Sequence, residues 1–520
     1  MEPMYRLDKI EKTIQDSVRK FSLDNILLAA HRAIKGQNES STYKISDEAG
    51  RIEPFVAAGI CSFAIRFSNV YRHADKQLTL LDFNQLYDLV LGYLTTDPIT
   101  TDEESANVFY NSNPVFLILR IIASQFPFKV NTFGSTGQPL LLFGELPNII
   151  RDKEGVPKFD FYEAFQKLTG LSIHDFLSGC FVTWSAALSQ NTSGITREYF
   201  EKARRQGIKI LNDEGILMLL ESISADPESF RKKYEEMKQA DRRFRIYDFN
   251  PLLTYPLIRP WRFYQNKSMA LDRMIAPLPD LVAYRASTGI FYEMFNNYKE
   301  QFSDYFGYLF EAYIGRLLEV SVTSQNLISE AALRSTYPES LGKAPDWIVL
   351  DGSTAILIES KSTRFSLKAL STGAVDSIDY SLKQVLKGLK QLYEVRQKAI
   401  AKTKGLERLH HCTEFKPLLV TFEPLYLVNS QLFRKHIDRL LSLEGIKNLP
   451  WHILSIKEFE LLQTHFKAGI SFADVLSKTE IMSFNEILKY VQEKTGLTYK
   501  DSFLYQKDLE MHEKLGINDL

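Results

Sequence analysis

The sequence predicts an α+β, multidomain protein in which a mostly helical N-terminal domain precedes an α/β core with a mixed central sheet. Three observations predict this. Apolar residues recur at helical spacing through roughly the first 240 residues. From residue 346 onward, short apolar runs bounded by turn residues alternate with a long helical pattern. The chain has 520 residues, which is too many for one ordinary hydrophobic core.

The N-terminal helices are predicted from spacing and stop signals. In the segment 21–34, apolar side chains fall at helical intervals, and Gly36 stands where a helix stop is expected. The apolar stretch 139–143 is bounded by glycines on both sides, which predicts a short hairpin strand. We therefore expect a mostly helical domain over 1–245. Its further helices are predicted at 54–73, 83–94, 114–126, 162–168, 173–188 and 197–203.

Residues 229–245 are heavily charged and mark the predicted end of this domain. Basic and acidic side chains are mixed there, which favours a solvated helix face over a nucleic-acid-binding arm. Prolines then predict an extended connection over 246–300, because each lacks a backbone donor and disfavours helix before it. Helical spacing returns over 284–320, at the start of the predicted core domain 301–465. The tail 466–520 is predicted to be helical and to pack as a small separate unit.

Composition narrows the class of protein. The net charge is −1, so contacts to nucleic acid would need a local basic patch and not the whole surface. The three cysteines, Cys61, Cys180 and Cys412, contain no CxxC pair, which excludes a zinc site of the usual spacing and a disulfide framework. There is no run of about 18 apolar residues and no signal core, so we expect a cytoplasmic protein without a membrane segment.

The residues that carry chemistry lie in one predicted β-hairpin. Asp351-Gly352 is a tight-turn signal between two apolar strands. Glu359 and Lys361 point the same way, because side chains alternate along a strand, and Asp346 falls roughly opposite Glu359. Two carboxylates and an ammonium thus meet at one end of an otherwise apolar hairpin. Buried charges are costly unless paired or metal-bound, and carboxylates are the ligands that Mg²⁺ prefers.

These residues resemble the motif of the PD-(D/E)XK, or restriction-endonuclease-like, nuclease superfamily. The Pro-Asp pair that ends at Asp346 matches its first element, and Glu359-x-Lys361 matches its E-x-K element on the following strand. The resemblance covers 302–424. It implies a restriction-endonuclease-like core and a nuclease that depends on Mg²⁺ or Mn²⁺. Asp346, Glu359 and Lys361 would be catalytic, with the two carboxylates as metal ligands and Lys361 handling the water and the phosphate charge.

The resemblance implies further site residues. Such families often add an acidic residue from a preceding helix, and Glu311 fits that place as a metal ligand. A helix after the hairpin tends to carry a polar stripe toward the site, and the predicted helix 377–400 has one. We expect Gln384 and Lys387 to contact the substrate. The whole stripe consists of Tyr380, Gln384, Lys387 and Gln391. The apolar run 417–422 takes the place of the next core strand.

Three hypotheses about function follow. The first is a metal-dependent nuclease whose N-terminal domain supplies recognition or restraint, in a bacterial defence or restriction-like role suggested by analogy alone. The second is a catalytically inactive nucleic-acid-binding or scaffold protein with a nuclease-like fold. The third is a metal-independent ribonuclease, because Arg66 and His73 on one predicted helix are similar to the Arg-x4-6-His motif of HEPN ribonucleases. The sequence leaves open DNA or RNA as the substrate, and a homo-oligomer or a partner protein.

Overall fold

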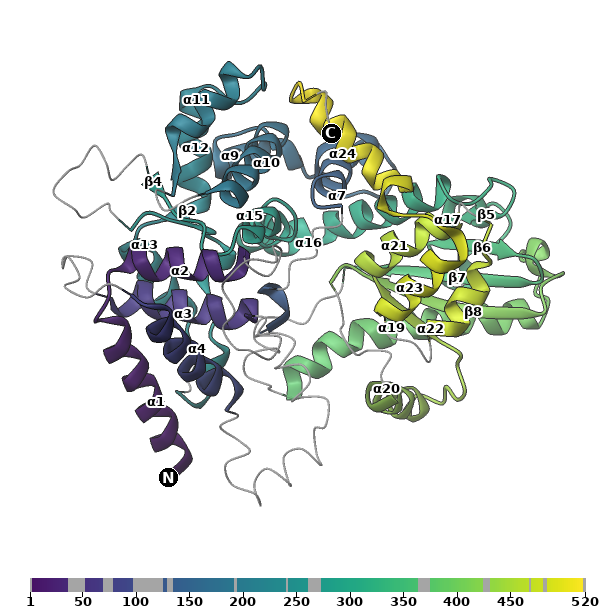
Figure 1. The fold of residues 1–520 in the computed structure, drawn as a ribbon. Coiled ribbons are helices and arrows are strands. Elements are labelled where there is room, and N and C mark those ends of the chain that lie inside the picture. The colour runs from purple at the N-terminus through teal and green to yellow at the C-terminus, as the bar shows by residue number, and fades with distance from the viewer. Residues whose placement is uncertain are drawn as a thin grey trace.

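The computed structural model describes most of the chain, and its architecture is mixed α and β, as predicted. Figure 1 shows a helical N-terminal part beside a sheet that is flanked by helices. Among the described residues, no helix is both long and apolar enough to cross a membrane. The described residues are 2–35, 52–68, 78–96, 125–128, 134–190, 194–239, 242–260, 273–362, 375–423, 431–466, 469–479 and 484–517.

The first helices form a core of their own with later segments. The helix α4 begins at a capping box in which Thr79 and Asp82 exchange hydrogen bonds, which satisfies backbone donors at the helix start. Leu252, Ile258 and Leu281, from the segment predicted as an extended connection, are buried in this core. The helices of this core are α1 (Glu2–Val18), α2 (Leu23–Lys35), α3 (Pro54–Phe67), α4 (Leu80–Thr95) and, later in the chain, α13 (Pro227–Met237).

The other helices that precede the sheet share a core with it. Phe165 and Phe176 belong to the same buried cluster as Phe306, Ile356 and Leu418. These helices are α7 (Gly137–Pro139), α8 (Leu146–Ile150), α9 (Phe161–Thr169), α10 (Ile173–Ser189), α11 (Arg197–Arg205), α12 (Asp213–Ile223), α15 (Asp280–Arg285) and α16 (Thr288–Glu319). Short pairs connect them, namely β1 (Ile195–Thr196) with β4 (Arg273–Met274), and β2 (Ser224–Ala225) with β3 (Leu257–Ile258).

The prediction of a hairpin strand at 139–143 was wrong. These residues are helical, because α7 continues into a π-helical turn, η2 (Leu140–Glu145), and then into α8. Leu140, Leu141, Leu142 and Phe143 are all at most 1% exposed, so the segment is buried on every side. A short run that is apolar on every side shows neither period, which is why spacing could not separate strand from helix here.

The sheet has five strands and is mixed, as predicted. Its order is β5-β6-β7-β8-β9, with the first two pairings antiparallel and the last two parallel. The predicted hairpin, long helix and third strand are confirmed as β6, β7, α19 and β8. The strands are β5 (Leu327–Ser329), β6 (Trp347–Asp351), β7 (Thr354–Lys361), β8 (Glu414–Thr421) and β9 (His452–Ser455), and α19 (Val375–Ile400) and α20 (Gln431–Leu443) link the parallel ones.

The central strand β7 is buried on both faces. Ile356 and Ile358 pack in the core that contains α16, whereas Leu357 packs on the other face with residues of α19 such as Leu392. This explains why the run 355–358 is continuously apolar, because a strand with both faces covered need not alternate. The sheet is therefore sandwiched between α16 with α21 (Ile456–Phe466) on one side and α19 on the other.

The C-terminal tail is helical as predicted but is not a separate unit. Val475 and Leu504 are buried in the cluster that also contains α16 and the sheet. Asp351, at the hairpin turn, accepts hydrogen bonds from Ser471 Oγ at 2.8 Å and from the Ala473 amide at 2.9 Å. Figure 1 shows these last helices in yellow, with α22 and α23 in front of the strands and α24 beside α7. They are α22 (Phe472–Thr479), α23 (Phe484–Thr495), α24 (Phe503–Lys514) and the 3-10 turn η7 (Tyr499–Asp501).

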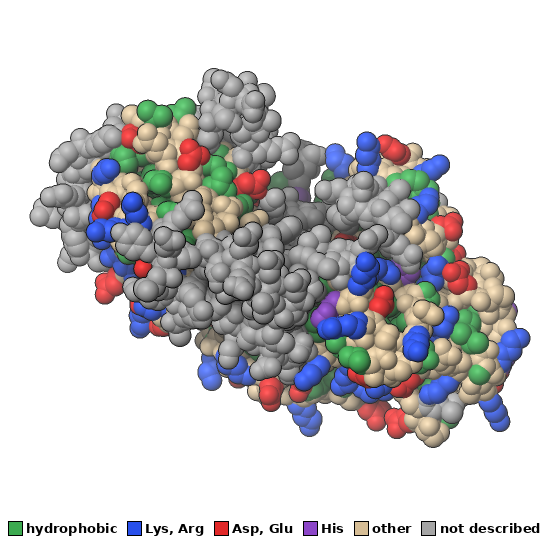
Figure 2. Space-filling model, turned by 90° about the horizontal axis from the view of Figure 1, so that it is seen from below, with side chains coloured by type: hydrophobic (Ala, Val, Ile, Leu, Met, Phe, Trp, Pro, Cys, Tyr) green, Lys and Arg blue, Asp and Glu red, His purple; other side chains and the backbone are tan. Residues whose placement is uncertain are grey.

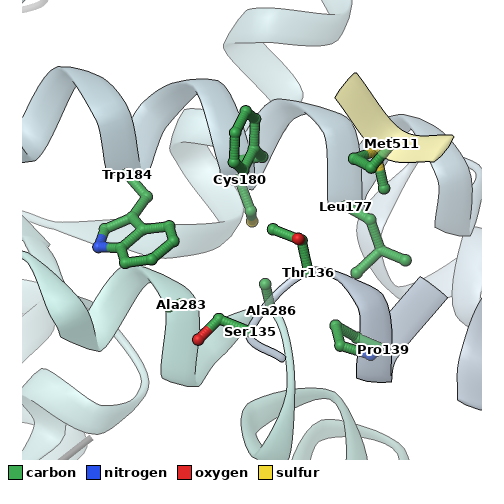
Figure 3. Close-up of a pocket in the computed structure, with 10 residues that line it drawn as sticks. Ser135, Thr136, Pro139, Leu177, Cys180, Trp184, Ala283, Ala286 and Met511 are labelled. Atoms are coloured by element: carbon green, nitrogen blue, oxygen red, sulfur yellow. The ribbon is translucent and has the colours of Figure 1, made fainter. Parts of the chain in front are cut away.

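A small cavity lies where α24 meets the N-terminal half. Figure 3 shows Cys180 and Trp184 of α10 on one side and Met511 of α24 on another. Its volume of about 10 Å³ leaves room for about one water molecule. The cavity is a packing gap at the junction of α7, α10, α15 and α24, and it is too small for a substrate.

Candidate active site

The predicted catalytic residues meet at one edge of the sheet. Asp346 directly precedes β6, and Glu359 and Lys361 lie at the end of β7. In the antiparallel ladder Trp347 pairs with Ile358, so Asp346 and Glu359 are the next two residues outward. The structure therefore places these two residues next to each other at the end of the ladder, as the spacing of the hairpin predicts.

The helix α16 reaches this edge because of a glycine. A Cβ atom added at Gly315 would lie 2.1 Å from Cζ2 of Trp347, so a larger residue would push β6 away from the helix. Trp347 follows Asp346, and Glu311 lies four residues before Gly315, one turn along the helix. The close approach at Gly315 therefore holds Glu311 near Asp346.

Asp346 is held by the residue between Glu359 and Lys361. Its Oδ2 accepts hydrogen bonds from the Ser360 amide at 2.6 Å and from Ser360 Oγ at 2.5 Å. Burial raises the pKa of Asp346, although these hydrogen bonds and the charge of Lys361 lower it in part. Sequence analysis missed Ser360 because the middle position of an E-x-K motif carries no residue type of its own. The predicted hairpin register alone would have placed its amide beside Asp346.

Glu359 is almost fully buried and lies between two donors. Its side chain is 2% exposed, and its Oε1 is hydrogen-bonded and ion-paired to Lys361 Nζ. Its Oε2 accepts a hydrogen bond of 2.6 Å from Gln391 Nε2, which also donates to the Ala344 carbonyl at 2.9 Å. Gln391 stood in the predicted polar stripe but was not singled out as a site residue. The structure shows that it links the strand of Glu359 to the segment that leads into Asp346.

The carboxyl groups of the site hold their protons unusually tightly. Burial, followed by repulsion from Asp346, raises the pKa of Glu359 to about 8. The pKa of Glu311 is likewise raised to about 8, by burial and then by repulsion from Asp346 and Glu330. The pKa of Lys361 is raised as well, because the attraction of Glu359 outweighs the effect of burial, which alone would lower it. The ammonium therefore stays charged, while the carboxyl groups repel one another.

A fourth carboxylate, Glu330, belongs to this cluster. It begins α17 (Glu330–Arg334), its amide donates to the Asp346 carbonyl at 2.8 Å, and its charge raises the pKa of Asp346, Glu311 and Glu359. Its Oε1 accepts from Arg334 Nε at 3.2 Å and Nη2 at 3.1 Å. Sequence analysis missed Glu330 because no motif marks it. Its nearness depends on β5 pairing with β6.

The two predicted substrate residues lie on α19 near the site. Gln384 is partly buried, and Lys387 is exposed one turn before Gln391. A Cβ atom added at the neighbouring Gly388 would lie 3.5 Å from Cε of Lys361, so the helix passes close to the site at this point. Lys387 is thus near enough to remain a candidate phosphate contact, whereas Gln384 lies about 10 Å before Gln391 along the helix.

The alternative ribonuclease pair is described only in part. Arg66 stacks its guanidinium 4.0 Å from the ring centre of Tyr234, and its Nε donates to the Ser62 carbonyl at 3.3 Å. This residue is therefore engaged in packing within the first core. His73 lies outside the described residues.

The donor set fits a hard divalent cation. Across the described ranges, no three acidic, histidine or cysteine side chains already converge as a preformed ion cage. Asp346, Glu359 and Glu311 nevertheless supply the carboxylate oxygens that Mg²⁺ and Mn²⁺ prefer. Their raised pKa values show a mutual repulsion that a cation would offset.

Comparisons with known proteins add no relative. No protein-family model matches the chain, and no curated protein or solved structure matches it. The resemblance to the PD-(D/E)XK superfamily therefore depends on the motif residues and on the geometry described above.

Proposed function

We propose that this chain is a metal-dependent nuclease that hydrolyses phosphodiester bonds in nucleic acid, with a core of the restriction-endonuclease-like type. One observation supports this above the others. Asp346, Glu359 and Glu311 gather with Lys361 at one sheet edge, where burial and repulsion raise the pKa of each carboxyl group. Such a gathering of buried carboxyl groups destabilises the fold, and it is typical of sites that bind a cation or a substrate.

The roles of the residues follow from their chemistry. Asp346, Glu359 and Glu311 would hold Mg²⁺ or Mn²⁺, which when bound polarises the phosphate and lowers the pKa of a water. Lys361 keeps its proton, since its pKa is raised, so its role is to orient the attacking water and to stabilise charge on the phosphate. Gln391 holds Glu359 in place from α19.

The helical N-terminal half is proposed to supply recognition or restraint. Its helices α8 to α10 share one buried cluster with α16 and the sheet, so they have a fixed position relative to the site. Figure 2 shows Lys and Arg interspersed with Asp and Glu among the described residues of one face. With a net charge of −1, contacts to nucleic acid would be local ones near the site. A defence or restriction-like role is proposed by analogy alone.

A second candidate is a nucleic-acid-binding or scaffold protein that keeps the fold without the activity. The observation that favours it is the local bonding of the two main carboxylates. Asp346 accepts two hydrogen bonds from Ser360, and Glu359 is bonded to both Lys361 and Gln391. Side chains that are satisfied in this way can persist without any catalytic role.

One assay tests the proposal. The purified chain is incubated with plasmid DNA, single-stranded DNA and tRNA, in Mg²⁺, in Mn²⁺ and in EDTA. We expect cleavage of at least one substrate that needs the divalent ion and is lost in Glu359→Gln. Binding without cleavage would favour the second candidate. Cleavage that persists in EDTA would overturn the proposal and direct attention to Arg66 and His73.

A further inference from the structure

A turn from the N-terminal half lies beside the acidic cluster. After α8, the chain turns through residues 151–156, where the Lys153 amide donates to the Ile150 carbonyl at 3.1 Å and the Val156 amide to the Lys153 carbonyl at 3.3 Å. A Cβ atom added at Gly155 would lie 3.9 Å from Oη of Tyr308. Tyr308 lies three residues before Glu311, so both occupy neighbouring positions on one side of α16.

Both ends of this turn are anchored in the core. Ile150 is 1% exposed, and Val156 packs against the buried cluster that contains α16. Beyond the turn, the ring of Phe159 lies 5.9 Å from that of Phe302 and 5.2 Å from that of Tyr305. The turn is therefore fixed along α16, with its tip next to the end of the site that Glu311 occupies.

The tip presents one exposed ammonium to the site. Lys153 is exposed and stands two residues before Gly155, whose place beside Tyr308 sets the turn on the side of α16 that carries Glu311. Within the described ranges, Lys153 makes no ion pair, in contrast to Arg151, whose Nη2 lies 2.8 Å from Asp160 Oδ2. Lys361 is engaged by Glu359. Lys153 is thus a cation at this edge that can meet an incoming anion, and it comes from the N-terminal half, whereas Lys387 comes from α19.

We propose that Lys153, a residue of the N-terminal half, binds a backbone phosphate of the nucleic-acid substrate and positions the strand at the site. This inference rests on the proposed nuclease function and adds a substrate contact from outside the motif-bearing core. An anionic strand that approaches four carboxyl groups is repelled by them. A cation at the rim offsets part of that repulsion and guides the phosphates toward the bound metal.

The test separates binding from cleavage in the full-length chain. In a Lys361→Ala background, which we expect to bind without cleaving, affinity for short fluorescein-labelled single-stranded DNA, duplex DNA and RNA is measured by anisotropy over a range of salt. Adding Lys153→Ala should weaken binding of the preferred nucleic acid about three- to tenfold. It should also reduce the dependence of log affinity on log salt by about 1. Lys153→Glu should weaken binding further.

Lys158→Ala is the matched control. Lys158 is also exposed, but it adjoins Phe159, which packs against Phe302 and Tyr305, so it lies roughly 10 Å from Glu311 along α16, farther than the turn beside Tyr308. If both Lys153 variants bind and cleave like Lys158→Ala while Lys361→Ala is inactive, the inference is wrong and the nuclease function stands. If the wild-type chain neither binds nor cleaves any of the three nucleic acids, both are wrong.

Discussion

Two groups of buried acids lie on opposite sides of α16, and they differ in the charge of the groups that act most strongly on them. Glu460 of α21 is 1% exposed and accepts from Gln138 Nε2 at 2.6 Å and from the Tyr313 hydroxyl at 2.9 Å. Its Oε2 lies 3.3 Å from Lys457 Nζ. Around Glu311, the strongest influence after burial is repulsion from Asp346.

Burial of an acid does not, by itself, mark a functional site. Burial raises the pKa of Glu460, but the influences that follow, from Lys457 and the hydroxyl and amide donors, all lower it. At the sheet edge, the next influence on Glu311 and on Glu359 raises the pKa further. Glu460 thus joins three segments of the core, whereas at the sheet edge the repulsion between carboxyl groups is only partly compensated by Lys361 and the hydrogen-bond donors. Under the proposed function, a bound cation would offset that repulsion.

The sharpest way to test this contrast is to remove the ammonium of the site. Lys361→Ala should reduce cleavage about 10²- to 10⁴-fold, because a positioned electrostatic stabiliser contributes that much to the rate. Metal affinity, measured by calorimetry, should change little, since Lys361 has no ligating oxygen. Lys390→Ala is the control, because that ammonium lies on α19 with an exposed side chain and pairs with Glu444 at 2.6 Å. A folded Lys361→Ala protein that cleaves normally would place the chemistry elsewhere.

The same substitution at the two buried acids should change stability in opposite ways. Glu460→Gln removes the charge that pairs with Lys457 and should lower the free energy of unfolding by about 2 kcal/mol. Glu359→Gln, in EDTA and at pH 9, removes repulsion from Asp346 and should leave stability unchanged or higher. Urea unfolding followed by fluorescence compares the two. Equal losses of stability would show that the sheet-edge cluster is a structural network like the one around Glu460.

Stability without metal should fall as the pH rises. The pKa of Glu311 and of Glu359 is about 8 in the folded chain against 4.5 for the ordinary value, so between these limits the folded state binds more protons than the unfolded state. The stabilisation that Glu311 and Glu359 contribute is therefore fully present below about pH 4.5 and is lost as the pH rises through about 8. The melting temperature in EDTA should decrease over this range by more in the wild type than in a chain that carries both Glu311→Gln and Glu359→Gln.

A divalent ion should reverse this trend. Binding must displace the protons of Glu311 and Glu359, so Mg²⁺ should raise the melting temperature more at pH 9 than at pH 6. The doubly substituted chain should show little response at either pH. A wild-type response to Mg²⁺ that does not depend on pH would mean that these carboxyl groups do not bind the ion.

The hairpin of the site could be predicted from the sequence because its rules are local. The Asp351-Gly352 turn sets the register, and the alternation of side chains then fixes Glu359 and Lys361 on one face, opposite Asp346. Glu311 followed from the resemblance. The hairpin residues required only that neighbouring strands pair as their spacing indicates, whereas Glu311 lies on α16.

The remaining members of the cluster depend on contacts that spacing does not reveal. Glu330 joins it through the pairing of β5 with β6, and Lys153 lies beside it on a turn of the N-terminal half, far from the motif in the sequence. Both lack a motif, and their charges resemble those of solvated surface residues.

The smallest effect expected is that of Gln391, which acts through Glu359 and is a positioning residue. Gln391→Leu removes the donor to Glu359 Oε2 and to the Ala344 carbonyl, and should lower kcat about tenfold, as loss of a partner that orients a metal ligand typically does. Affinity for nucleic acid should not change. The loss of a hydrogen bond to the charged form should raise the pKa of Glu359 further, so the pH at which cleavage reaches half its maximum should increase. Gln397→Leu, at an exposed position later on α19, is the control. A uniform loss of rate at every pH would instead indicate that the helix packs less tightly. If Gln391 acts by positioning, Gln391→His should recover the wild-type pH profile, because an imidazole N–H can donate to the same carboxylate.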